Sequence, residues 1–231
     1  MASPNIQQLF SRIAPDYDRL NHILSFWCDY SWRRLFLRTL PCTPGMTMLD
    51  LCTGTADCAL GAVKYNQDID VFGVDFSLPM LEVAQKKIKR TRGRRAITLV
   101  NADARTLPFC DGTFDITVSA FGLRNLLATE ETAIPEIART LRTNGHLCLL
   151  EFAPPPSSRL KNFYRFYLKT LVPAVGGWLS QSPLAYQYLA ESIASFLPPE
   201  NVAALLARHS FTEISYQPLS GGITYIYQAR K

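Results

Sequence analysis

The feature of this sequence that most restricts its fold is a series of five short apolar runs separated by helical stretches. Runs rich in valine, isoleucine and leucine that alternate with helices are typical of βαβ units, in which parallel strands lie in one sheet. The helices between the runs are expected over Ala56–Tyr65, Pro79–Lys89 and Glu130–Leu141, and Asn144-Gly145 is expected to end the last of them. The five predicted strands are Thr47–Cys52, Val71–Val74, Ile97–Val100, Phe114–Ser119 and His146–Phe152.

Beyond Pro154-Pro155-Pro156 the pattern changes to helices followed by a hairpin. Apolar residues between Leu160 and Leu171 recur at spacings of three and four, and a second helix is expected over Pro199–His209. The last two apolar runs, Phe211–Gln217 and Ile223–Ala229, predict an antiparallel hairpin. We therefore expect an α/β fold with a seven-stranded, mostly parallel sheet and a C-terminal antiparallel hairpin. That layout is typical of Rossmann-like class I methyltransferases, whereas a dinucleotide dehydrogenase usually continues with parallel units.

The chain is long enough for one domain of this kind, and no linker divides its 231 residues. The first forty residues are helical in pattern and rich in aromatic side chains, which predicts a helical cap over 1–40. We expect a cofactor-binding core over 46–152, helices facing a substrate or a membrane over 157–209, and a closing hairpin over 210–231.

Several features favour a cytoplasmic protein. The first twenty residues lack the apolar core of a signal peptide, and no apolar run reaches the roughly 18 residues that a membrane-spanning helix needs. The six cysteines are scattered without a CxxC pair, as expected in a reducing compartment and not for a disulfide framework or a zinc site. The net charge of +5 is too small to decide between an anionic membrane face and nucleic acid as a partner.

Acidic residues and a glycine turn follow the first three strands. Asp50 and Gly54 belong to the turn after the first run, Asp75 ends the second run 25 residues after Asp50, and Asp103 follows the third. Ligands of open α/β sheets bind at the carboxyl ends of strands, where glycine admits a ligand and an acid can accept hydrogen bonds from ribose hydroxyls. Each signal alone is equally compatible with an ordinary turn or cap. A dinucleotide is disfavoured because G-x-G-x-x-G is absent: Ala56 stands two places after Gly54.

With these positions in view, the chain resembles the ubiquinone/menaquinone C-methyltransferase family nearly end to end. The most specific match is the segment Phe121–Asn125, which is followed by Leu150-Glu151-Phe152. Two departures are notable: the family usually has glycine at Ala56, and a closing histidine is replaced around Tyr225. Other matching segments are Phe10–Asp18 with Asn21 and Ser25, Leu49–Asp57, Leu107-Pro108-Phe109 with Phe114-Asp115, the positions Glu136 and Leu141, Tyr186–Ile193, and Gly221-Gly222.

The resemblance implies S-adenosylmethionine as the cofactor and no metal. Tyr17 would close the site over the sulfonium, although a packed core tyrosine is an equally good interpretation. The Cβ of Ala56 would project near the methionyl portion of the cofactor. The residues expected to bind the cofactor are Asp50, Gly54, Thr55, Asp75, Asp103, Ala104, Ala120 and Tyr17.

On the substrate side, the resemblance implies methylation of a quinol ring carbon. Arg124 would stabilise the phenolate as it forms and, because a guanidinium does not readily release a proton, would polarise a water chain rather than act as the base. The structural alternative for Arg124 is an ion pair with an acid such as Glu151. Asn125 and Tyr188 are expected at the substrate, and His22 is a candidate for proton transfer.

Two basic segments bear on partners. The run from Lys86 to Arg95 is interpreted as a solvated helix end. The stretch Arg159–Lys169 combines an aromatic face with flanking cations, which suits either an interfacial helix or a substrate pocket. Nucleic acid is not expected as a partner, because the Asn/Asp-Pro-Pro-aromatic motif that holds a flipped base is absent after the fourth strand. The aromatic residues of the two helical regions would also suit a homodimer.

By resemblance, the acceptor is a prenylated quinol, with demethylmenaquinol first. A 2-methoxy-6-polyprenyl-1,4-benzoquinol and a phylloquinol precursor remain alternatives. A non-catalytic cofactor-binding scaffold in quinone synthesis and a small phenolic or amine methyltransferase are hypotheses of other classes. Contact with the cytoplasmic face of a membrane would follow from a lipid substrate.

Overall fold

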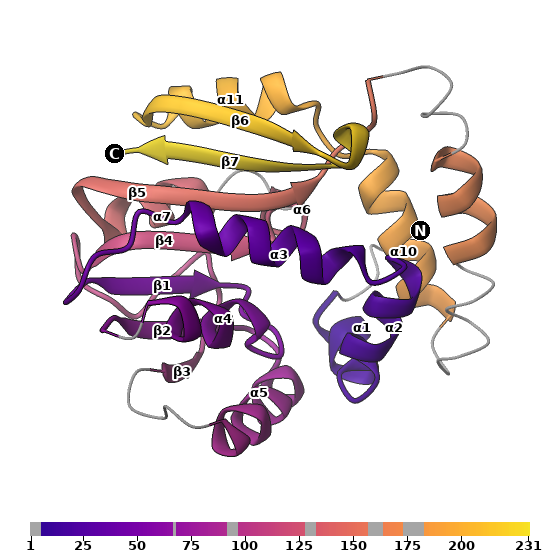
Figure 1. Cartoon of the computed structure of the whole chain (residues 1–231), viewed down its shortest axis with the longest axis horizontal. Coiled ribbons are helices and arrows are strands. Elements are labelled where there is room, and N and C mark those ends of the chain that lie inside the picture. The colour runs from indigo at the N-terminus through magenta and orange to yellow at the C-terminus, as the bar shows by residue number, and fades with distance from the viewer. Residues whose placement is uncertain (1–5, 67, 92–96, 128–132, 157–163, 173–182) are drawn as a thin grey trace.

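A computed structural model describes residues 6–66, 68–91, 97–127, 133–156, 164–172 and 183–231 of the chain. Its centre is a seven-stranded sheet in the order β3-β2-β1-β4-β5-β7-β6 (Figure 1). The first five strands pair in parallel, and β7 pairs antiparallel with both β5 and β6. This confirms the predicted parallel sheet with a C-terminal hairpin. The strands are β1 (Thr47–Leu51), β2 (Asp70–Asp75), β3 (Ile97–Asn101), β4 (Phe114–Ala120), β5 (Leu141–Phe152), β6 (Thr212–Leu219) and β7 (Thr224–Arg230).

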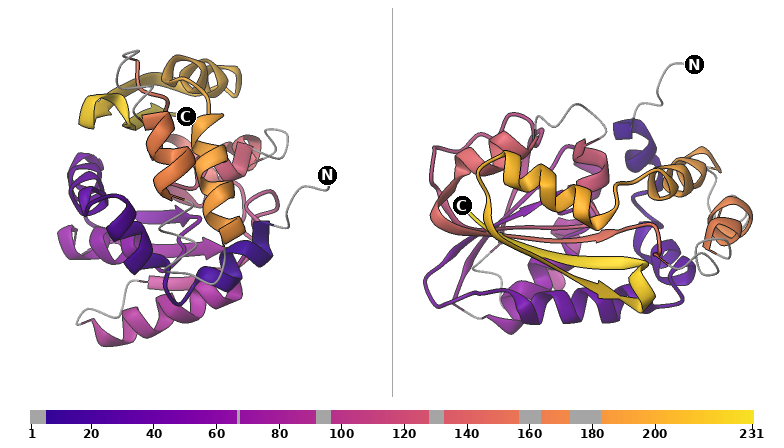
Figure 2. Two further views of the ribbon diagram at one scale, coloured as in Figure 1. Left: turned by 90° about the vertical axis from the view of Figure 1, so that its right-hand side faces the viewer. Right: turned by 90° about the horizontal axis from the view of Figure 1, so that it is seen from above.

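Both faces of the sheet are buried under helices. Successive side chains of a strand point to opposite faces, so Met48 and Leu49 of β1 belong to two different core clusters. The helices α3 (Cys28–Thr39), α4 (Asp57–Tyr65) and α5 (Leu78–Arg90) cover one face (Figure 1). The other face is covered by α6 (Leu123–Leu127), α7 (Ala133–Thr140) and α11 (Pro199–Arg208), as the view from above shows (Figure 2).

A group of helices lies beyond the carboxyl ends of the parallel strands (Figures 1 and 2). It consists of α1 (Ile6–Ile13), α2 (Tyr17–Leu24), the π-helix η2 (Tyr167–Leu171) and α10 (Pro183–Ala194). These helices share a third core cluster that includes Leu20, Leu168 and Tyr186. We call this group the helical cap. The 3-10 turn η3 (Ser220–Gly222) joins β6 to β7, and the side chain of Ser220 accepts a hydrogen bond from Trp32 Nε1 at 2.8 Å.

The structure corrects three details of the sequence prediction. Asn144-Gly145 does not end a helix: α7 ends at Thr140, and Asn144, with φ 64°, lies inside β5 where its register against β4 shifts. The tertiary pairing with β4 therefore overrides a local stop signal. The expected helix over Leu160–Leu171 is described only from residue 164, and its last turn is π-helical. Of the first forty residues, α3 packs on the sheet and is not part of the cap.

Candidate functional site

A cavity of about 550 Å³ opens at the carboxyl ends of β1, β2, β3 and β4, within the size range of small-molecule sites. Of the expected cofactor residues, Tyr17, Gly54, Asp75, Asp103, Ala104 and Ala120 line it, and the expected substrate residue Asn125 does so too. We call it the sheet-edge cavity. Apolar side chains from the helical cap, the strand ends, α5 and α6 complete its wall, namely Phe10, Val74, Met80, Phe121 and Leu126.

The turn after β1 is held by the carboxylate that ends β2. Asp75 Oδ2 accepts a hydrogen bond from the Gly54 amide at 2.9 Å, and its Oδ1 accepts one from the Ser77 amide at 2.9 Å. Cys52 and Gly54 both have positive φ, at 57° and 54°, which brings the turn backbone round to the cavity. Burial raises the pKa of Asp75, and the amide hydrogen bonds partly offset that rise. Each carboxylate oxygen of Asp75 keeps a lone pair for a ribose hydroxyl.

Asp50 lies beneath this turn and is not among the residues that line the sheet-edge cavity. Its Oδ2 accepts hydrogen bonds from Thr53 Oγ1 at 2.6 Å and from the Ala59 amide at 3.0 Å. Burial raises the pKa of Asp50 to about 7. The contacts of Asp50 are those of a residue that shapes the cofactor turn, not of one that touches a cofactor.

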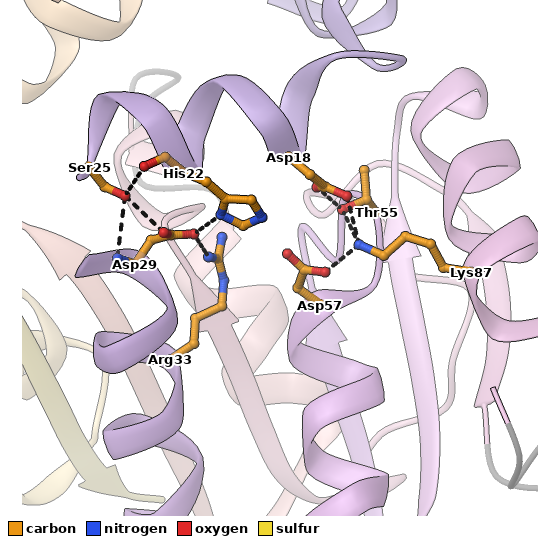
Figure 3. A network of polar contacts seen from close by, with 8 residues as sticks. All are labelled: Asp18, His22, Ser25, Asp29, Arg33, Thr55, Asp57 and Lys87. Carbon is orange, nitrogen blue, oxygen red and sulfur yellow. Dashed lines mark hydrogen bonds and ion pairs between the residues drawn. The ribbon is translucent and has the colours of Figure 1, made fainter. Parts of the chain in front are cut away.

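Thr55 faces the helical cap instead of the sheet-edge cavity. Its Oγ1 donates to Asp18 at 2.6 Å and accepts from Lys87 Nζ at 3.1 Å. Lys87 also pairs with Asp18 at 2.8 Å and with Asp57, so one cation of α5 joins α2 to the start of α4 (Figure 3). Lys87 belongs to the basic run that the sequence suggested was solvated, whereas its side chain is about three-quarters buried.

Ala56 has φ 66°, a conformation that favours glycine, and its side chain is fully buried in the core cluster shared with α3 and α4. It is not among the residues that line the sheet-edge cavity. The expectation of a Cβ next to the cofactor stays a prediction, because the structure shows only that Ala56 lies outside this wall. The departure from glycine affects the backbone of the turn.

Asp103 follows β3 at the rim of the sheet-edge cavity. Both its carboxylate oxygens accept hydrogen bonds from Arg105 Nε, at 2.9 and 3.0 Å, and these bonds lower the pKa of Asp103. Ala104, beside it, is buried and apolar. An ionised acceptor next to a buried alanine suits the amino group and the flat face of an adenine ring.

These residues fit S-adenosylmethionine. The wall offers carboxylate acceptors for ribose and adenine, apolar surface for the ring, and the aromatic rings of Phe10, Tyr17 and Phe121, whose faces attract a sulfonium cation. The one guanidinium in the wall, Arg105, is bonded to Asp103. The wall thus matches an uncharged adenosine carrying a sulfonium better than it matches a pyrophosphate.

A second cavity, of about 330 Å³, lies between the helical cap and the sheet and is lined mostly by apolar side chains. Phe10, Tyr17 and Phe121 line both cavities and so separate them. We call it the apolar cavity. Tyr188, expected at the substrate, lines it, and Tyr188 Oη donates a hydrogen bond to Asn125 Oδ1 at 3.0 Å, which joins the walls of the two cavities.

Arg124 is a buried cation in the wall of the apolar cavity. Its Nη1 donates to Glu151 Oε1 at 2.9 Å and to the Phe121 carbonyl at 2.6 Å, while its own amide donates to Glu151 Oε2 at 3.0 Å. The ion pair that the sequence offered as the structural alternative is therefore present. Arg124 Nε, however, is buried without a hydrogen-bond partner among the described residues. Burial lowers the pKa of Arg124, but Glu151 more than offsets this, so the pKa lies above its ordinary value and the guanidinium remains charged.

His22 does not line either cavity formed by the described part of the chain. Its ring is stacked on Tyr30, and its Nδ1 lies 2.7 Å from Asp29 Oδ2 (Figure 3). Arg33 Nη1 donates to the same oxygen at 2.7 Å, and Ser25 Oγ donates to Asp29 Oδ1 at 2.8 Å. The contacts of His22 are thus with the Asp29 network and not with the predicted substrate.

Sequence reasoning missed two charged residues in the wall of the apolar cavity, Asp29 and Arg33. Their spacing of four residues on a helix is a signal for an ion pair and could have drawn attention to them. The guanidinium of Arg33 also lies 5.2 Å from the centre of the Phe121 ring, a contact between distant segments that the sequence does not reveal.

Comparison with known proteins identifies the family of the chain. The model of the ubiE/COQ5 methyltransferase family matches residues 1–231. The chain belongs to this family. It is 41% identical over 223 residues to a demethylmenaquinone methyltransferase of Thermus thermophilus, which covers 95% of this chain and 98% of that protein. It is 36% identical over 227 residues to a ubiquinone/menaquinone biosynthesis C-methyltransferase UbiE of Geotalea uraniireducens, covering 98% and 96% of the two chains.

Solved structures support the Rossmann-like methyltransferase fold of this family member. A SAM-dependent methyltransferase of Thermotoga maritima, a possible histamine N-methyltransferase, is similar with a TM-score of 0.68 at 18% identity, covering 98% of this chain and 100% of that one. A SAM-dependent methyltransferase of Aquifex aeolicus has a TM-score of 0.60 at 16% identity, with 86% and 88% covered. At these identities the likeness concerns the fold alone. No helix among the described residues is long and apolar enough to span a membrane.

Proposed function

We propose that this ubiE/COQ5 family methyltransferase transfers a methyl group from S-adenosylmethionine to a ring carbon of a reduced prenylated quinone, with demethylmenaquinol as the first acceptor. The relatives that are 34–41% identical include demethylmenaquinone methyltransferases, which supports a naphthoquinol over other phenols. The observation that carries the proposal is the buried guanidinium of Arg124 in the wall of the mostly apolar cavity, with Nε left without a partner among the described residues.

Each part of the site has a role in such a reaction. When bound, S-adenosylmethionine supplies an electrophilic methyl group. Asp75 and Asp103 hold the ribose and adenine, and Phe10, Tyr17 and Phe121 form the boundary at which the cofactor methyl faces the ring. The apolar cavity orients the ring and keeps bulk water from it, which lowers the barrier to a bimolecular transfer.

Arg124 stabilises the developing phenolate oxygen of the quinol through Nε, a buried donor that has no partner among the described residues. The ring carbon gains a methyl group and loses its proton to a water molecule that Arg124 polarises. Arg124 does not take this proton itself, since Glu151 keeps the guanidinium charged. The hydrogen-bonded pair of Asn125 and Tyr188 fixes the wall on which the ring rests.

The test is methyl transfer from labelled S-adenosylmethionine to reduced demethylmenaquinone, to 2-methoxy-6-polyprenyl-1,4-benzoquinol and to a small phenol. Label on the ring carbon of the naphthoquinol is the expected result. Label on the benzoquinol alone would move the assignment to the ubiquinone branch. If the cofactor binds and no acceptor is labelled, the proposal is wrong and a cofactor-binding scaffold becomes the better description.

A further inference from the structure

We propose that the mouth of the apolar cavity docks on an anionic phospholipid bilayer through four exposed apolar side chains, Phe26, Trp27, Phe166 and Leu171, here called the rim. The inference deepens the proposed function, because it says where a lipid quinol would enter. It rests on that function for the identity of the substrate only.

The rim joins two segments far apart in the sequence. The turn between α2 and α3 carries Phe26 and Trp27, and the helix of residues 164–172 carries Phe166 and Leu171. The ring of Phe26 lies 6.2 Å from that of Tyr167, and Tyr167 Oη donates a hydrogen bond to the Leu24 carbonyl. The two segments are therefore in contact.

The rim side chains are exposed to a degree that is unusual for large apolar residues. Phe26 and Trp27 are 72% and 58% exposed, and Phe166 and Leu171 are 58% and 41% exposed. Phe26 and Trp27 also have positive φ, 50° and 60°, a strained conformation for aromatic residues. Contiguous exposed apolar surface of this kind marks an interaction site.

The rim is also the opening of the apolar cavity. Phe26 and Leu171 are largely exposed and at the same time line the cavity. A ring bound near Arg124 can therefore leave its prenyl tail between these two side chains. A substrate whose tail stays in a membrane reaches the cavity without crossing water if the rim lies in the bilayer surface.

The positive charge of the segments that carry the rim favours an anionic lipid surface as the partner. In α2, α3 and residues 164–172, every exposed ionic side chain is a cation; these are Arg19, Arg34, Arg38, Arg165 and Lys169. Arg165 and Lys169 lie on the same helix as Phe166 and Leu171, and cations beside exposed apolar residues suit an anionic lipid surface. A second copy of this chain is a poorer occupant, because a two-fold contact through the rim would bring Arg165 and Lys169 of each copy together.

The test measures binding to vesicles of phosphatidylcholine with and without about one-third phosphatidylglycerol, at low salt and at about 0.5 M salt. We expect binding only to the anionic vesicles, weakened by salt. The variant Trp27→Asn/Phe166→Gln should bind at least tenfold more weakly, because asparagine tolerates positive φ and removes the apolar ring. Tyr65→Asn is the matched control: Tyr65 is a 41% exposed aromatic on α4, outside the rim, and its variant should bind like the wild type.

Two further readouts separate docking from catalysis. Brominated lipids should quench the fluorescence of Trp27, measured as the difference between the wild type and Trp27→Phe. Methyl transfer to quinol dispersed in detergent should be equal in the wild type and in Trp27→Asn/Phe166→Gln, whereas transfer to quinol in anionic vesicles should fall at least tenfold in the variant.

Equal vesicle binding by the wild type and the rim variant would overturn the proposal. So would a dimer that the rim variant converts to a monomer in the absence of any vesicle binding, since a second copy would then cover the rim. If vesicle binding follows the expectation and no quinol is methylated even in detergent, the proposed function fails and the docking surface stands.

Discussion

The guanidinium of Arg124 is only partly hydrogen-bonded by the described residues. Glu151 and the Phe121 carbonyl hold Nη1 of the guanidinium, and Nε is buried without a partner among the described residues. A lysine at this position would supply a point charge but not several directed hydrogen bonds. An alanine would leave the Glu151 carboxylate buried and unpaired, which commonly destabilises a protein by about 3–5 kcal/mol.

For this reason Arg124→Lys, and not Arg124→Ala, is the informative variant. We expect its kcat to fall by roughly 100-fold or more, by analogy with the loss of one electrostatic donor at an active site. Its Kd for S-adenosylmethionine should stay within about threefold of the wild type. Turnover measured with labelled cofactor and Kd measured by calorimetry check this. Arg142→Lys, at an exposed ion pair with Asp115, is the control. A parallel loss of cofactor affinity would show that Arg124 only supports the fold.

Asp50 should make the stability of the fold depend on pH. Its pKa in the folded chain is about 7, against an ordinary value of 3.8, so the folded state binds a proton that the unfolded state releases between these values. The stability that this proton contributes is therefore complete below about pH 4 and is lost as pH rises through 7. We expect the free energy of unfolding to fall by roughly 2–4 kcal/mol across that window relative to Asp50→Asn.

Urea unfolding at several pH values measures this difference. Asp70→Asn, at the exposed start of β2, is the control and should follow the wild type. Parallel curves for the wild type and Asp50→Asn would contradict a buried, protonatable Asp50.

At the scale of elements, one lysine links the cap to two helices that cover the sheet. Lys87 of α5 pairs with Asp18 of α2 and Asp57 of α4, and Thr55 bonds to both Lys87 and Asp18. The elements that this network joins also carry Tyr17, which lines both cavities. The network thus connects α2, which carries Tyr17, to the cofactor turn through Thr55.

Replacing Lys87 by methionine should loosen α2. The carboxylates of Asp18 and Asp57, which are largely buried, lose their cation. We therefore expect a loss of about 1 kcal/mol in the free energy of unfolding. The Kd for S-adenosylmethionine should rise several-fold, because Tyr17 is then less firmly placed. Calorimetry and limited proteolysis of the N-terminal segment measure both effects. Lys86→Met, at an exposed position on the same helix, should leave them unchanged; equal effects in the two variants would refute the fastening role.

The predicted elements agree with the structure to different degrees. All five strand cores were correct, because short runs rich in valine, isoleucine and leucine that alternate with helices indicate parallel strands. The end of the helix before β5 was wrong, because Asn144-Gly145 has the same local signature in a bulged strand as after a helix. Only the pairing of β5 with β4 distinguishes the two.

At the scale of the whole molecule, the two cavities lie where separate parts of the chain meet. The sheet-edge cavity uses residues from α1 and α2 as well as from the strand ends, so a bound cofactor contacts both the cap and the core. A ligand that binds only the folded state stabilises it by mass action.

We therefore expect S-adenosylmethionine at about a hundred times its Kd to stabilise the chain by about 2.7 kcal/mol. The corresponding rise in Tm is roughly 5–10 °C. Differential scanning calorimetry tests this, and Asp75→Asn should show little of the shift at the same cofactor concentration. An equal shift in Asp75→Asn would place the cofactor away from the end of β2.

The sequence by itself determined the strands of the sheet, the hairpin and the positions of Gly54, Asp75 and Asp103, because strands and their ends follow from local periodicity. It also contained the motifs that resemble the family. Only the tertiary structure decided that Thr55 and Asp50 support the turn, that His22 contacts Asp29, and that Arg124 pairs with Glu151 while lining an apolar cavity. The reason is physical: the direction of a side chain depends on partners brought together from distant segments, and periodicity carries no information about them.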